Sequence, residues 1–434
     1  MNGAFLHLVD KPSLGRVLLL ILPVAVWLLL DVSTVLKNFS GITLKGFTPD
    51  LLLQHGQHRL GDDDDVPGGS ADLAYDAHRA QRSRASRNKA CNYAKGKWVA
   101  DVKRPLYSGN ACKQWLSKMW SCRGMERTDF SYEGYRWQPH DCQMPEFSGP
   151  NFLHRMRHKT LAFVGDSLGR EQFQSMMCIA TGGKHSPEVE DVRQKYGIVK
   201  ASSPFTPGGS AYRFPETNTT ILFYWSPTLS EHEPLMNMTT KKTSNVLHID
   251  RPADFLKKYL HSFDILVLNT GHHWNRVKFW RNHWKLYNDG KPVGNGTLVA
   301  KDFSRAREIK LHNIARWVDS ELVHHPRTKV FLRTISPEHF VNGEWNTGGR
   351  CDNTIPLSSG SEVLQDRSGD LAAESAVNGT RLKLLDITAI SQLRSEGHIS
   401  NHSVKAQRAV YDCLHWCLPG IPDMWNELLF AQMY

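Results

Sequence analysis

Five short apolar segments after residue 149 constrain the fold of this chain more than any other feature of its sequence. Longer segments of helical or loop character separate them. Short apolar strands that alternate with helices are typical of an α/β protein in which helices cover both faces of a parallel sheet. We therefore predict a doubly wound, five-stranded parallel sheet. Its strands are KTLAFVG (159–165), TTILFYW (219–225), FDILVLNTG (263–271), KVFLRTIS (329–336) and LKLLDIT (382–388).

Polar clusters follow three of these predicted strands: GDSLGRE, NTGHHW and SPEH. Ligands bind at the carboxyl ends of the strands in such sheets. In the first cluster, Ser167 stands between a strand and a predicted helix, where the helix dipole and free backbone N–H groups favour a developing oxyanion. Gly165 permits the turn and a close approach of substrate. Ser167 is therefore a candidate nucleophile, and its alternative role is that of a simple helix N-cap.

The same cluster matches the G-x-S-x-G pattern of the α/β-hydrolase elbow, through Gly165, Ser167 and Gly169. In that fold the serine follows several earlier strands of its sheet. Here Ser167 follows the first strand of the α/β region, so the strand order argues against an α/β-hydrolase fold.

Asp412 and His415 lie in the late run DCLHWC. Their spacing lets a carboxylate sit beside an imidazole and hold its tautomer. Cys413 and Cys417 bracket the histidine, and bridges at both would fix its position. A lone D-x-x-H arises easily by chance in a chain with 21 histidines. Its combination with the GDS turn and the flanking cysteines predicts a triad of Ser167, His415 and Asp412.

The segment LNTGHHWNR supplies further candidates for the site. Asn269 and Gly271 can offer a side-chain amide and a backbone N–H to an oxyanion. We expect His272 at the cleft. Two adjacent histidines without a third ligand at a known spacing do not form a zinc site, so no metal is expected.

The run VLLLILPVAVWLLL (17–30) carries no charge, and weaker apolar character continues to residue 36. Twenty helical residues span about 30 Å, the thickness of a membrane's hydrocarbon core. We therefore predict a transmembrane signal anchor at 17–36, with residues 1–16 in the cytoplasm because Lys11 and Arg16 precede the anchor. A cleaved signal peptide is the alternative, because the charge-free core has only 14 residues. Both predict that the rest of the chain is lumenal or extracellular.

Eight cysteines and a set of glycosylation sequons agree with that compartment. All the cysteines follow residue 90, their number is even and no C-x-x-C pair occurs, which favours disulfides over a metal site or free thiols. Besides Asn38, which lies near the predicted anchor, the candidate glycosylation sites are Asn218, Asn237, Asn295, Asn378 and Asn401.

The chain before the sheet divides into two parts of different composition. Residues 37–89 combine acidic and basic runs with few periodic apolar residues, so we predict a flexible stem. Residues 90–148 hold four cysteines and ten aromatic residues and predict a disulfide-stapled subdomain with little regular structure. Exposed aromatic side chains there can stack on sugars, but we expect most of them to form a core with the catalytic domain at 149–434. The net charge of +10 suits an anionic partner, and without a nucleic-acid-binding module we expect no nucleic acid.

Together these segments resemble the plant trichome birefringence-like family, which includes polysaccharide O-acetyltransferases with an SGNH/GDSL-like (PC-esterase) catalytic domain. The resemblance covers about residues 90–434 and rests on CNYAKGKWV, SGNACKQWLSKMWSC, YRWQPHDC, FVGDSLGRE, NTGHHW, RTISPEHF and DCLHWCLPGIPDMWNELL. Glu171 and Met424 replace the Asn and the Thr or Val that are most common in the family. The resemblance implies an SGNH-hydrolase-like sheet and the disulfides Cys91–Cys142, Cys112–Cys178, Cys122–Cys417 and Cys351–Cys413.

The resemblance also implies a Golgi enzyme, a single-pass type II membrane protein with its catalytic domain in the lumen. Ser167 is expected to carry an acetyl group to a hydroxyl of xylan, xyloglucan or pectin. The donor is acetyl-CoA or an acetyl carrier supplied by a membrane partner, and no bound cofactor is expected. The alternatives are an acetyl esterase that uses the same triad with water, and a non-catalytic polysaccharide-binding protein, which would have no use for an intact triad. The sequence carries no signal for an oligomeric state.

Overall fold

The computed structural model describes residues 91–199, 208–236, 243–294, 302–402 and 410–433. The predicted cytoplasmic segment, anchor and stem lie outside these ranges, as do the sequons at Asn237 and Asn295. The sequons at Asn218, Asn378 and Asn401 are described and exposed. Within the described ranges, no helix has the length and apolar character needed to cross a membrane.

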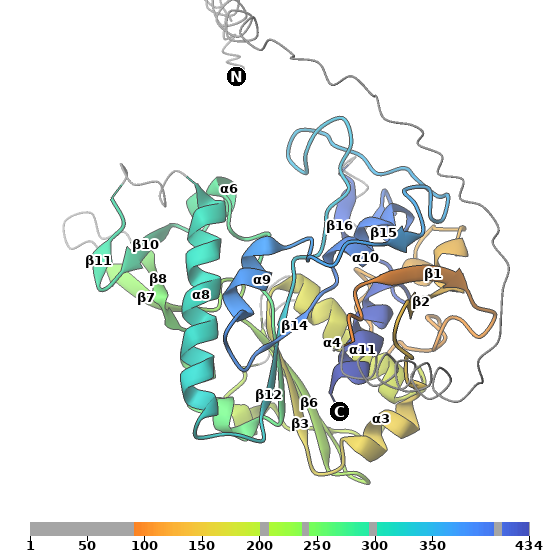
Figure 1. The fold of residues 1–434 in the computed structure, drawn as a ribbon, viewed down its shortest axis with the longest axis horizontal. Coiled ribbons are helices and arrows are strands. Elements are labelled where there is room, and N and C mark those ends of the chain that lie inside the picture. The colour runs from red at the N-terminus through yellow and green to blue at the C-terminus, as the bar shows by residue number, and fades with distance from the viewer. Residues whose placement is uncertain (1–90, 200–207, 237–242, 295–301, 403–409, 434) are drawn as a thin grey trace, which may run out of the picture. The chain divides into compact units, whose positions relative to one another are not determined.

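A seven-stranded mixed sheet lies at the centre of the described chain (Figure 1). Five of its strands are parallel and coincide with the five predicted segments, which confirms that part of the prediction. The predicted total of five strands was wrong, because two antiparallel strands extend one edge. One of them has only two residues, too few for a periodic pattern. The order in the sheet is β14 (Lys383–Leu385), β12 (Lys329–Arg333), β9 (Ile265–Leu268), β3 (Thr160–Gly165), β6 (Thr219–Trp225), β5 (Ser210–Phe214) and β4 (Glu190–Asp191).

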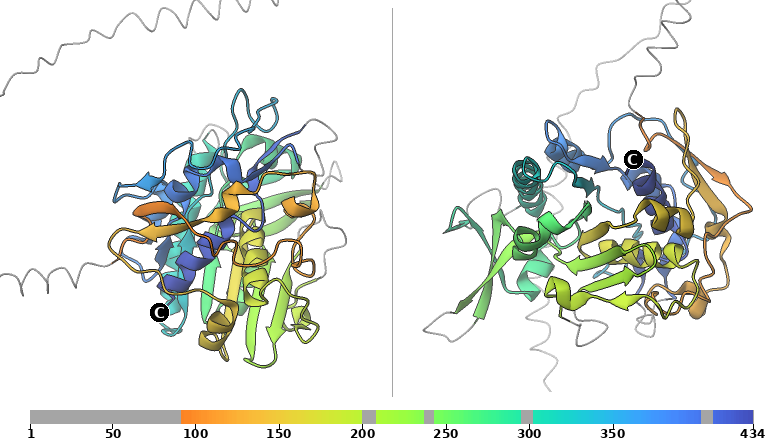
Figure 2. Two further views of the ribbon diagram at one scale, coloured as in Figure 1. Left: turned by 90° about the vertical axis from the view of Figure 1, so that its right-hand side faces the viewer. Right: turned by 90° about the horizontal axis from the view of Figure 1, so that it is seen from below.

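Alternate residues of β3 enter two different cores. Leu161 and Phe163 belong to the core that includes α4 and α11, whereas Ala162 and Val164 belong to the core that includes α8 and α9. The helices therefore cover both faces of the sheet, as Figures 1 and 2 show. Burial on both faces explains why the parallel strands are continuous apolar runs in the sequence. The helices are α3 (Gly149–Arg155), α4 (Ser167–Ala180), α5 (Asp254–Tyr259), α6 (Arg276–Arg281), α8 (Phe303–Leu322), α9 (Leu371–Val377), α10 (Thr388–Gln392) and α11 (Ile421–Gln432).

The order of the parallel strands positions the site. Along the chain β3 comes first, and the two parallel strands that follow, β6 and β9, lie on opposite sides of it. Crossovers that diverge in this way leave a crevice at the carboxyl ends of the strands. Ser167 follows β3 and Asn269 follows β9, so the topology brings the GDSLGRE and NTGHHW clusters to the same crevice.

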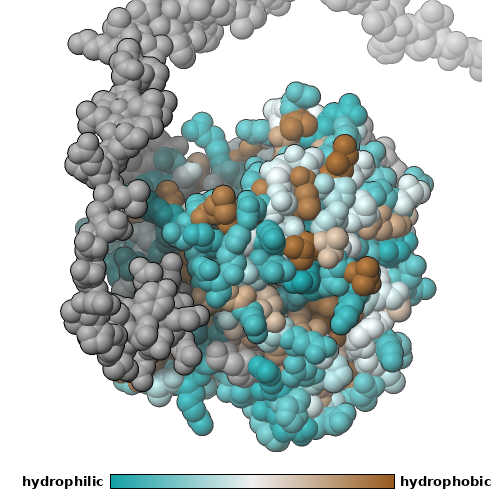
Figure 3. Space-filling model, turned by 45° about the vertical axis from the view of Figure 1, so that its right-hand side comes forward, coloured by the Kyte–Doolittle hydropathy of each residue, from teal (hydrophilic) through white to brown (hydrophobic). Residues whose placement is uncertain are grey.

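Residues 91–148 share a hydrophobic core with α4 and α11 rather than forming a core of their own. Their regular structure is limited to two strands and two 3₁₀ turns, and β1 also pairs with the distant β13. The face in Figure 3 is mainly hydrophilic, with separate apolar residues. The prediction of a shared core is confirmed for the seven buried aromatic residues, Trp98, Tyr107, Trp115, Trp120, Tyr132, Trp137 and Phe147.

Three smaller sheets complete the described structure, and none of them was predicted from the sequence. One contains strands from distant parts of the chain, one is built from strands within residues 230–292, and the third carries Asp412 and His415. Their strands are β1 (Gly96–Ala100), β2 (Tyr135–Pro139) and β13 (Glu362–Val363); β7 (Ser230–Met236), β8 (Thr243–Pro252), β10 (Trp284–Asn288) and β11 (Lys291–Pro292); and β15 (His398–Ser400) and β16 (Asp412–Trp416).

Four disulfides cross-link the described chain, and they are the pairs that the resemblance implied. Two of them attach the β16 region to other parts of the molecule, one to the N-terminal segment and one to the loop after β12. The pairs are Cys91–Cys142, Cys112–Cys178, Cys122–Cys417 and Cys351–Cys413.

Candidate active site

Ser167 is the first residue of α4 and comes two residues after the end of β3. Asp166 caps the helix, and its Oδ1 accepts a hydrogen bond from the Leu168 N–H at 3.0 Å. The N–H groups of a first helical turn have no partner within the helix. The Ser167 N–H is therefore placed to bind an oxyanion that develops beside its own side chain.

Asn269 packs against the turn that carries Ser167 and is hydrogen-bonded to its cap residue, Asp166. Its Nδ2 donates to Asp166 Oδ1 at 2.6 Å, and only 4% of its surface is exposed. A Cβ atom on Gly165 would lie 1.9 Å from Asn269 Oδ1, and one on Gly169 would lie 2.2 Å from it. The two glycines of the G-x-S-x-G match therefore make room for Asn269. Asn269 is bound to Asp166 and is not among the residues that line the pocket at Ser167, so its contact with an oxyanion stays a prediction.

This packing predicts different rescue behaviour for the two glycines. Gly169→Ala is expected to destabilise the protein by about 1–3 kcal/mol, because its Cβ would overlap the Asn269 side chain. Adding Asn269→Ala should recover much of this loss, since the next side chain, Phe223, is 3.7 Å away. Gly165→Ala should not be rescued, because its Cβ also meets the main-chain oxygen of Asn269 at 2.5 Å. Thermal unfolding of the single and double variants measures this, and equal rescue at both glycines would contradict the packing.

The structure brings Ser167, His415 and Asp412 together across 248 residues of sequence. His415 Nε2 lies 2.8 Å from Ser167 Oγ, and His415 Nδ1 lies 3.0 Å from both carboxylate oxygens of Asp412. A carboxylate accepts only, so Nδ1 carries the proton and Nε2 is the nitrogen that can accept the Ser167 hydroxyl proton. Asp412 Oδ1 also accepts from the His415 N–H at 3.0 Å. This is the arrangement of a nucleophile, a general base and the group that orients the base.

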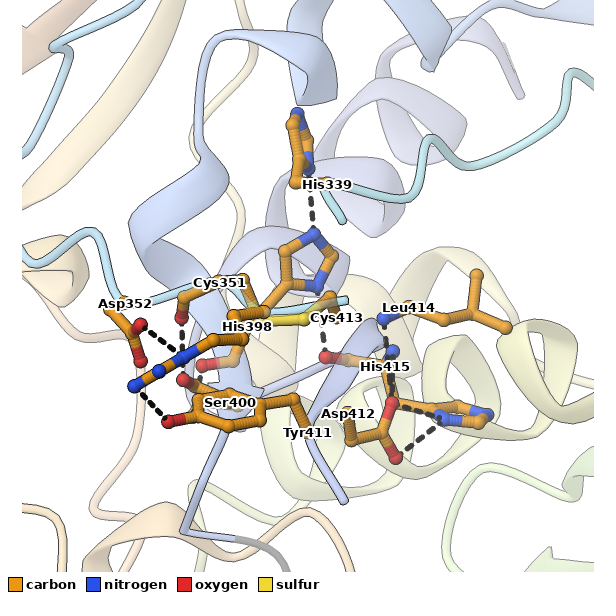
Figure 4. Close-up of a disulfide and its surroundings, with 12 residues drawn as sticks. His339, Cys351, Asp352, His398, Ser400, Tyr411, Asp412, Cys413, Leu414 and His415 are labelled. Carbon is orange, nitrogen blue, oxygen red and sulfur yellow. Dashed lines mark hydrogen bonds and ion pairs between the residues drawn. A yellow bond between two sulfur atoms is a disulfide. The ribbon is translucent and has the colours of Figure 1, made fainter. Parts of the chain in front are cut away.

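His415 lies in an irregular part of the β15–β16 ladder (Figure 4). His398 pairs with Trp416 and Ser400 pairs with Asp412, so three residues of β16 face a single residue of β15. Such bulges occur next to active sites because they turn a side chain in a new direction. The Cys351–Cys413 disulfide links the bulged segment of β16 to the loop after β12.

Trp120 supports the other side of the base and was not predicted as a site residue. Its ring stacks on the His415 ring, with 5.9 Å between centroids and 25° between planes, and it is fully buried. Trp120 lies two residues before Cys122, and His415 lies two residues before Cys417. The disulfide between these cysteines therefore sets the two rings side by side. Only the pairing of the cysteines, and no motif around Trp120, could have indicated this contact.

Glu171 is a buried carboxyl group close to the triad. It is 0% exposed, and its Oε1 accepts the Trp416 N–H at 2.8 Å. Burial raises the pKa of Glu171 to about 8, so the group is mainly a neutral carboxylic acid at pH 7. It therefore fixes the residue after His415 without adding a full negative charge beside Asp412.

Glu171→Gln is expected to keep activity, because glutamine offers the same neutral acceptor to Trp416. The unfolded chain loses the Glu171 proton at about pH 4.5, whereas the folded protein keeps it up to about pH 8. The contribution of Glu171 to the stability of the fold therefore falls as the pH rises between these two values. The melting temperature of the variant should therefore rise relative to wild type over that range. Glu171→Ala leaves the Trp416 N–H unpaired, so it should lose about 1–3 kcal/mol. Melting curves from about pH 5 to pH 8.5 test this. A difference in melting temperature between Glu171→Gln and wild type that does not change with pH would refute the neutral carboxyl.

A pocket of about 510 Å³ opens from Ser167 and His415. Its volume is in the range that holds small-molecule ligands. Gly271 and His272 line it, as predicted, and His272 Nε2 donates to the Ser336 carbonyl at 2.7 Å. Burial lowers the pKa of His273, the next lining residue, to about 4, so its imidazole is neutral.

The outer part of this pocket contains groups that the sequence did not indicate. Trp345 lines it, and the side chains of Lys278 and Arg281 lie 5.6 Å and 5.3 Å from the centre of its ring. Glu338 and Glu344 also line this pocket, so aromatic, cationic and acidic groups occur together in it. Such a mixture suits a polar ligand with many hydroxyl groups better than an apolar one.

Comparison with known proteins adds a family description for each part of the described chain. Residues 144–432 match the "GDSL/SGNH-like Acyl-Esterase family found in Pmr5 and Cas1p", and residues 89–143 match the "PMR5 N terminal Domain". The first range contains Ser167, Asp412 and His415, and the second contains Trp120 and Cys122.

Three similar proteins come from two plants. The chain is 57% identical over 358 residues to "Protein trichome birefringence-like 14" of Arabidopsis thaliana, covering 80% of this chain and 87% of that protein. It is 54% identical over 354 residues to "Protein trichome birefringence-like 15" of the same plant, covering 80% and 71%. It is 32% identical over 393 residues to "Xylan O-acetyltransferase 14" of Oryza sativa subsp. japonica, covering 81% and 79%.

Proposed function

This chain belongs to the trichome birefringence-like family, which confirms the resemblance seen in its sequence, and we propose that it is a polysaccharide O-acetyltransferase. The observation that carries the proposal is the alignment of Ser167 Oγ, His415 Nε2 and Asp412 in the lining of the 510 Å³ pocket. The name of the rice relative, a xylan O-acetyltransferase, supports transfer to a polysaccharide rather than to water. The acceptor that we favour is a cell-wall polysaccharide such as xylan, xyloglucan or pectin.

The reaction has two steps in this proposal. In the first, His415 Nε2 takes the proton from Ser167 Oγ, which bonds to the acetyl carbonyl carbon of the donor. The bond between the acetyl group and the donor breaks, and the leaving group takes the proton from His415. Asp412 stabilises the imidazolium that forms in between. The N–H groups of Ser167 and Gly271 are the donors that we propose for the oxyanion.

In the second step, a sugar hydroxyl occupies the place of the leaving group. His415 takes its proton, the hydroxyl oxygen bonds to the acetyl carbon, and the bond to Ser167 Oγ breaks. The proton then returns to Ser167 Oγ. Water can take the same place, so an esterase would use the same three residues, and the enzyme makes a sugar ester only if the sugar excludes water from the acyl-enzyme.

Acetyl transfer from a donor to deacetylated polysaccharides tests the proposal. The full chain is incubated with acetyl-CoA or with a chemically activated acetyl ester, and with xylan, xyloglucan or pectin. New acetyl esters on one of the polysaccharides, detected by NMR, are the expected result. Release of acetate without any sugar ester would instead assign an acetyl esterase. Binding of polysaccharide without loss of the donor would assign a binding protein.

We further propose that the chain is a type II protein of the Golgi membrane, anchored by residues 17–36. The charge-free run at 17–30, preceded by Lys11 and Arg16, supports this orientation. The donor would then be acetyl-CoA itself or an acetyl carrier that a membrane partner supplies. Protection of the catalytic part from protease in sealed Golgi vesicles is the expected result. Digestion of the catalytic part in intact vesicles would show that it faces the cytoplasm, contrary to the proposal.

A further inference from the structure

Two histidines lie directly behind the β16 bulge and form a hydrogen-bonded chain with it (Figure 4). His339 Nδ1 lies 2.7 Å from His398 Nε2. At one end of the chain, His339 Nε2 lies 3.0 Å from the Gln392 carbonyl oxygen. At the other end, His398 Nδ1 lies 3.0 Å from the carbonyl oxygen of His415.

The protons in this chain can be counted. A carbonyl oxygen only accepts, so both outer nitrogens, His339 Nε2 and His398 Nδ1, must carry a proton. The two inner nitrogens are close enough that exactly one proton must lie between them, because two lone pairs or two N–H groups would repel. The three contacts therefore need three protons, whereas two neutral imidazoles carry two. The complete chain is a histidine pair with a single positive charge.

We infer that His339 and His398 are positioning residues that hold the strand of His415 in place and that share one extra proton to do so. The β15 strand cannot hold this segment by ordinary pairing, because three residues of β16 bulge out opposite it. His398 Nδ1 supplies the missing contact to the His415 carbonyl, and the His339 main-chain N–H donates to the Cys413 carbonyl at 3.0 Å. The inference rests on the proposed role of His415 as the general base.

The surroundings of the pair decide how its charge responds to pH. The His398 ring is buried and stacks on Trp416 at 3.8 Å. Burial lowers the pKa of both His339 and His398, and the His339 ring lowers the pKa of His398 further, so the pair gains its extra proton only below the ordinary histidine range. The shared proton therefore binds in mildly acidic solution and leaves as the pH rises.

Charged groups approach the pair from three sides. Asp412 on β16 favours the proton, and His415 opposes it when charged. From the N-terminal segment, Arg127 donates to the His398 carbonyl oxygen at 2.6 Å. Arg394 precedes the 3₁₀ turn Ser395–Gly397 that leads into β15, and it is bound by Glu396 at 2.6 Å, so this pair adds little net charge near β15. Loss of the shared proton removes one contact of the chain and weakens the support of His415.

His339→Asn separates the shared proton from the other titrations of the site. The asparagine Nδ2 takes the place of His339 Nδ1 and donates to His398 Nε2 without needing a charge. His339→Phe offers no donor, and His154→Asn, at an exposed position on α3, is the matched control. The rate of acetyl release from 4-nitrophenyl acetate by the full chain is measured for each from about pH 5 to pH 8, a range that brackets the ordinary histidine pKa. Dividing the wild-type rate by each variant rate cancels the titrations of His415 and Glu171.

The ratio of wild type to His339→Asn is expected to fall about three- to tenfold as the pH rises, the effect of one lost hydrogen bond. The ratio to the control should stay constant, and His339→Phe should be slower than His339→Asn throughout. A ratio to His339→Asn that does not change with pH would overturn the shared proton. Absence of ester cleavage in wild type would refute the proposed function alone. In that event ¹⁵N NMR of labelled histidines still decides, because the pair with the extra proton has three protonated ring nitrogens whereas two neutral rings have two.

Discussion

Replacing Ser167 with alanine is expected to lower acetyl transfer by about 10⁴- to 10⁶-fold, the range seen when the nucleophile of such a triad is removed. The variant keeps His415, Asp412 and the helix N-terminus but has no atom that can hold the acetyl group. The fold should be preserved, because the hydrogen bond of the Ser167 side chain is to His415 Nε2. Transfer assays with the full chain test the loss of activity. Thermal unfolding tests the fold, and the free energy of unfolding should stay within about 0.5 kcal/mol of wild type.

Ser304→Ala is the matched control for this experiment. Ser304 also lines the pocket, but it is exposed in the first turn of α8 and is not part of the triad. Its replacement should leave the rate within about twofold of wild type, as for a surface substitution. If Ser167→Ala retained a tenth or more of the wild-type rate, the acyl-enzyme mechanism would be wrong. Unchanged binding of polysaccharide by the inactive variant would show that acceptor binding does not need the nucleophile.

Removing the Cys122–Cys417 disulfide by replacing both cysteines with alanine is expected to impair stability and activity together. The bridge joins residues 295 apart in sequence, so its loss should destabilise the protein by about 3–5 kcal/mol. It also fixes Trp120 against His415. Release of that contact should lower the rate about tenfold or more even in the fraction that remains folded, because small displacements of a base reduce catalysis strongly.

The Cys91–Cys142 disulfide provides the comparison. It closes a loop of 51 residues, so its loss should also lower the melting temperature. Cys91 is exposed, and neither cysteine neighbours a residue of the triad in sequence. Activity per folded molecule, measured well below the melting temperature of each variant, should therefore fall only in the Cys122/Cys417 double variant. An equal fall in both would show that the N-terminal segment does not act specifically on His415.

These contacts give the cysteine-rich segment a role different from that of a separate sugar-binding module. Trp120 supports the ring of His415, Cys122 holds the chain after it, and Arg127 donates to the His398 carbonyl behind it. All three come from the short stretch between Trp120 and Arg127. The segment thus completes the support of the base, which explains why its aromatic residues are buried rather than exposed.

The sequence by itself indicated the parallel strands and the three residues that we propose as the triad. The strands were recognisable because burial on both faces leaves a continuous apolar run that can be read locally. Ser167 was recognisable because a strand, a glycine and a helix start are adjacent in the chain. The pair Asp412 and His415 lies within one short strand, so its spacing is also a local signal.

Only the tertiary structure decided how these parts support one another. The edge strands β4 and β5, the stacking of Trp120 on His415 and the chain from His339 to β16 all depend on contacts between distant segments, for which no local pattern exists. Asn269 shows the same limit. Its position after β9 was readable, but the direction of its amide toward Asp166 depends on the space left by Gly165 at the end of β3 and Gly169 in α4. Local patterns report burial and backbone conformation, whereas the direction of a side chain is set by the neighbours that folding brings to it.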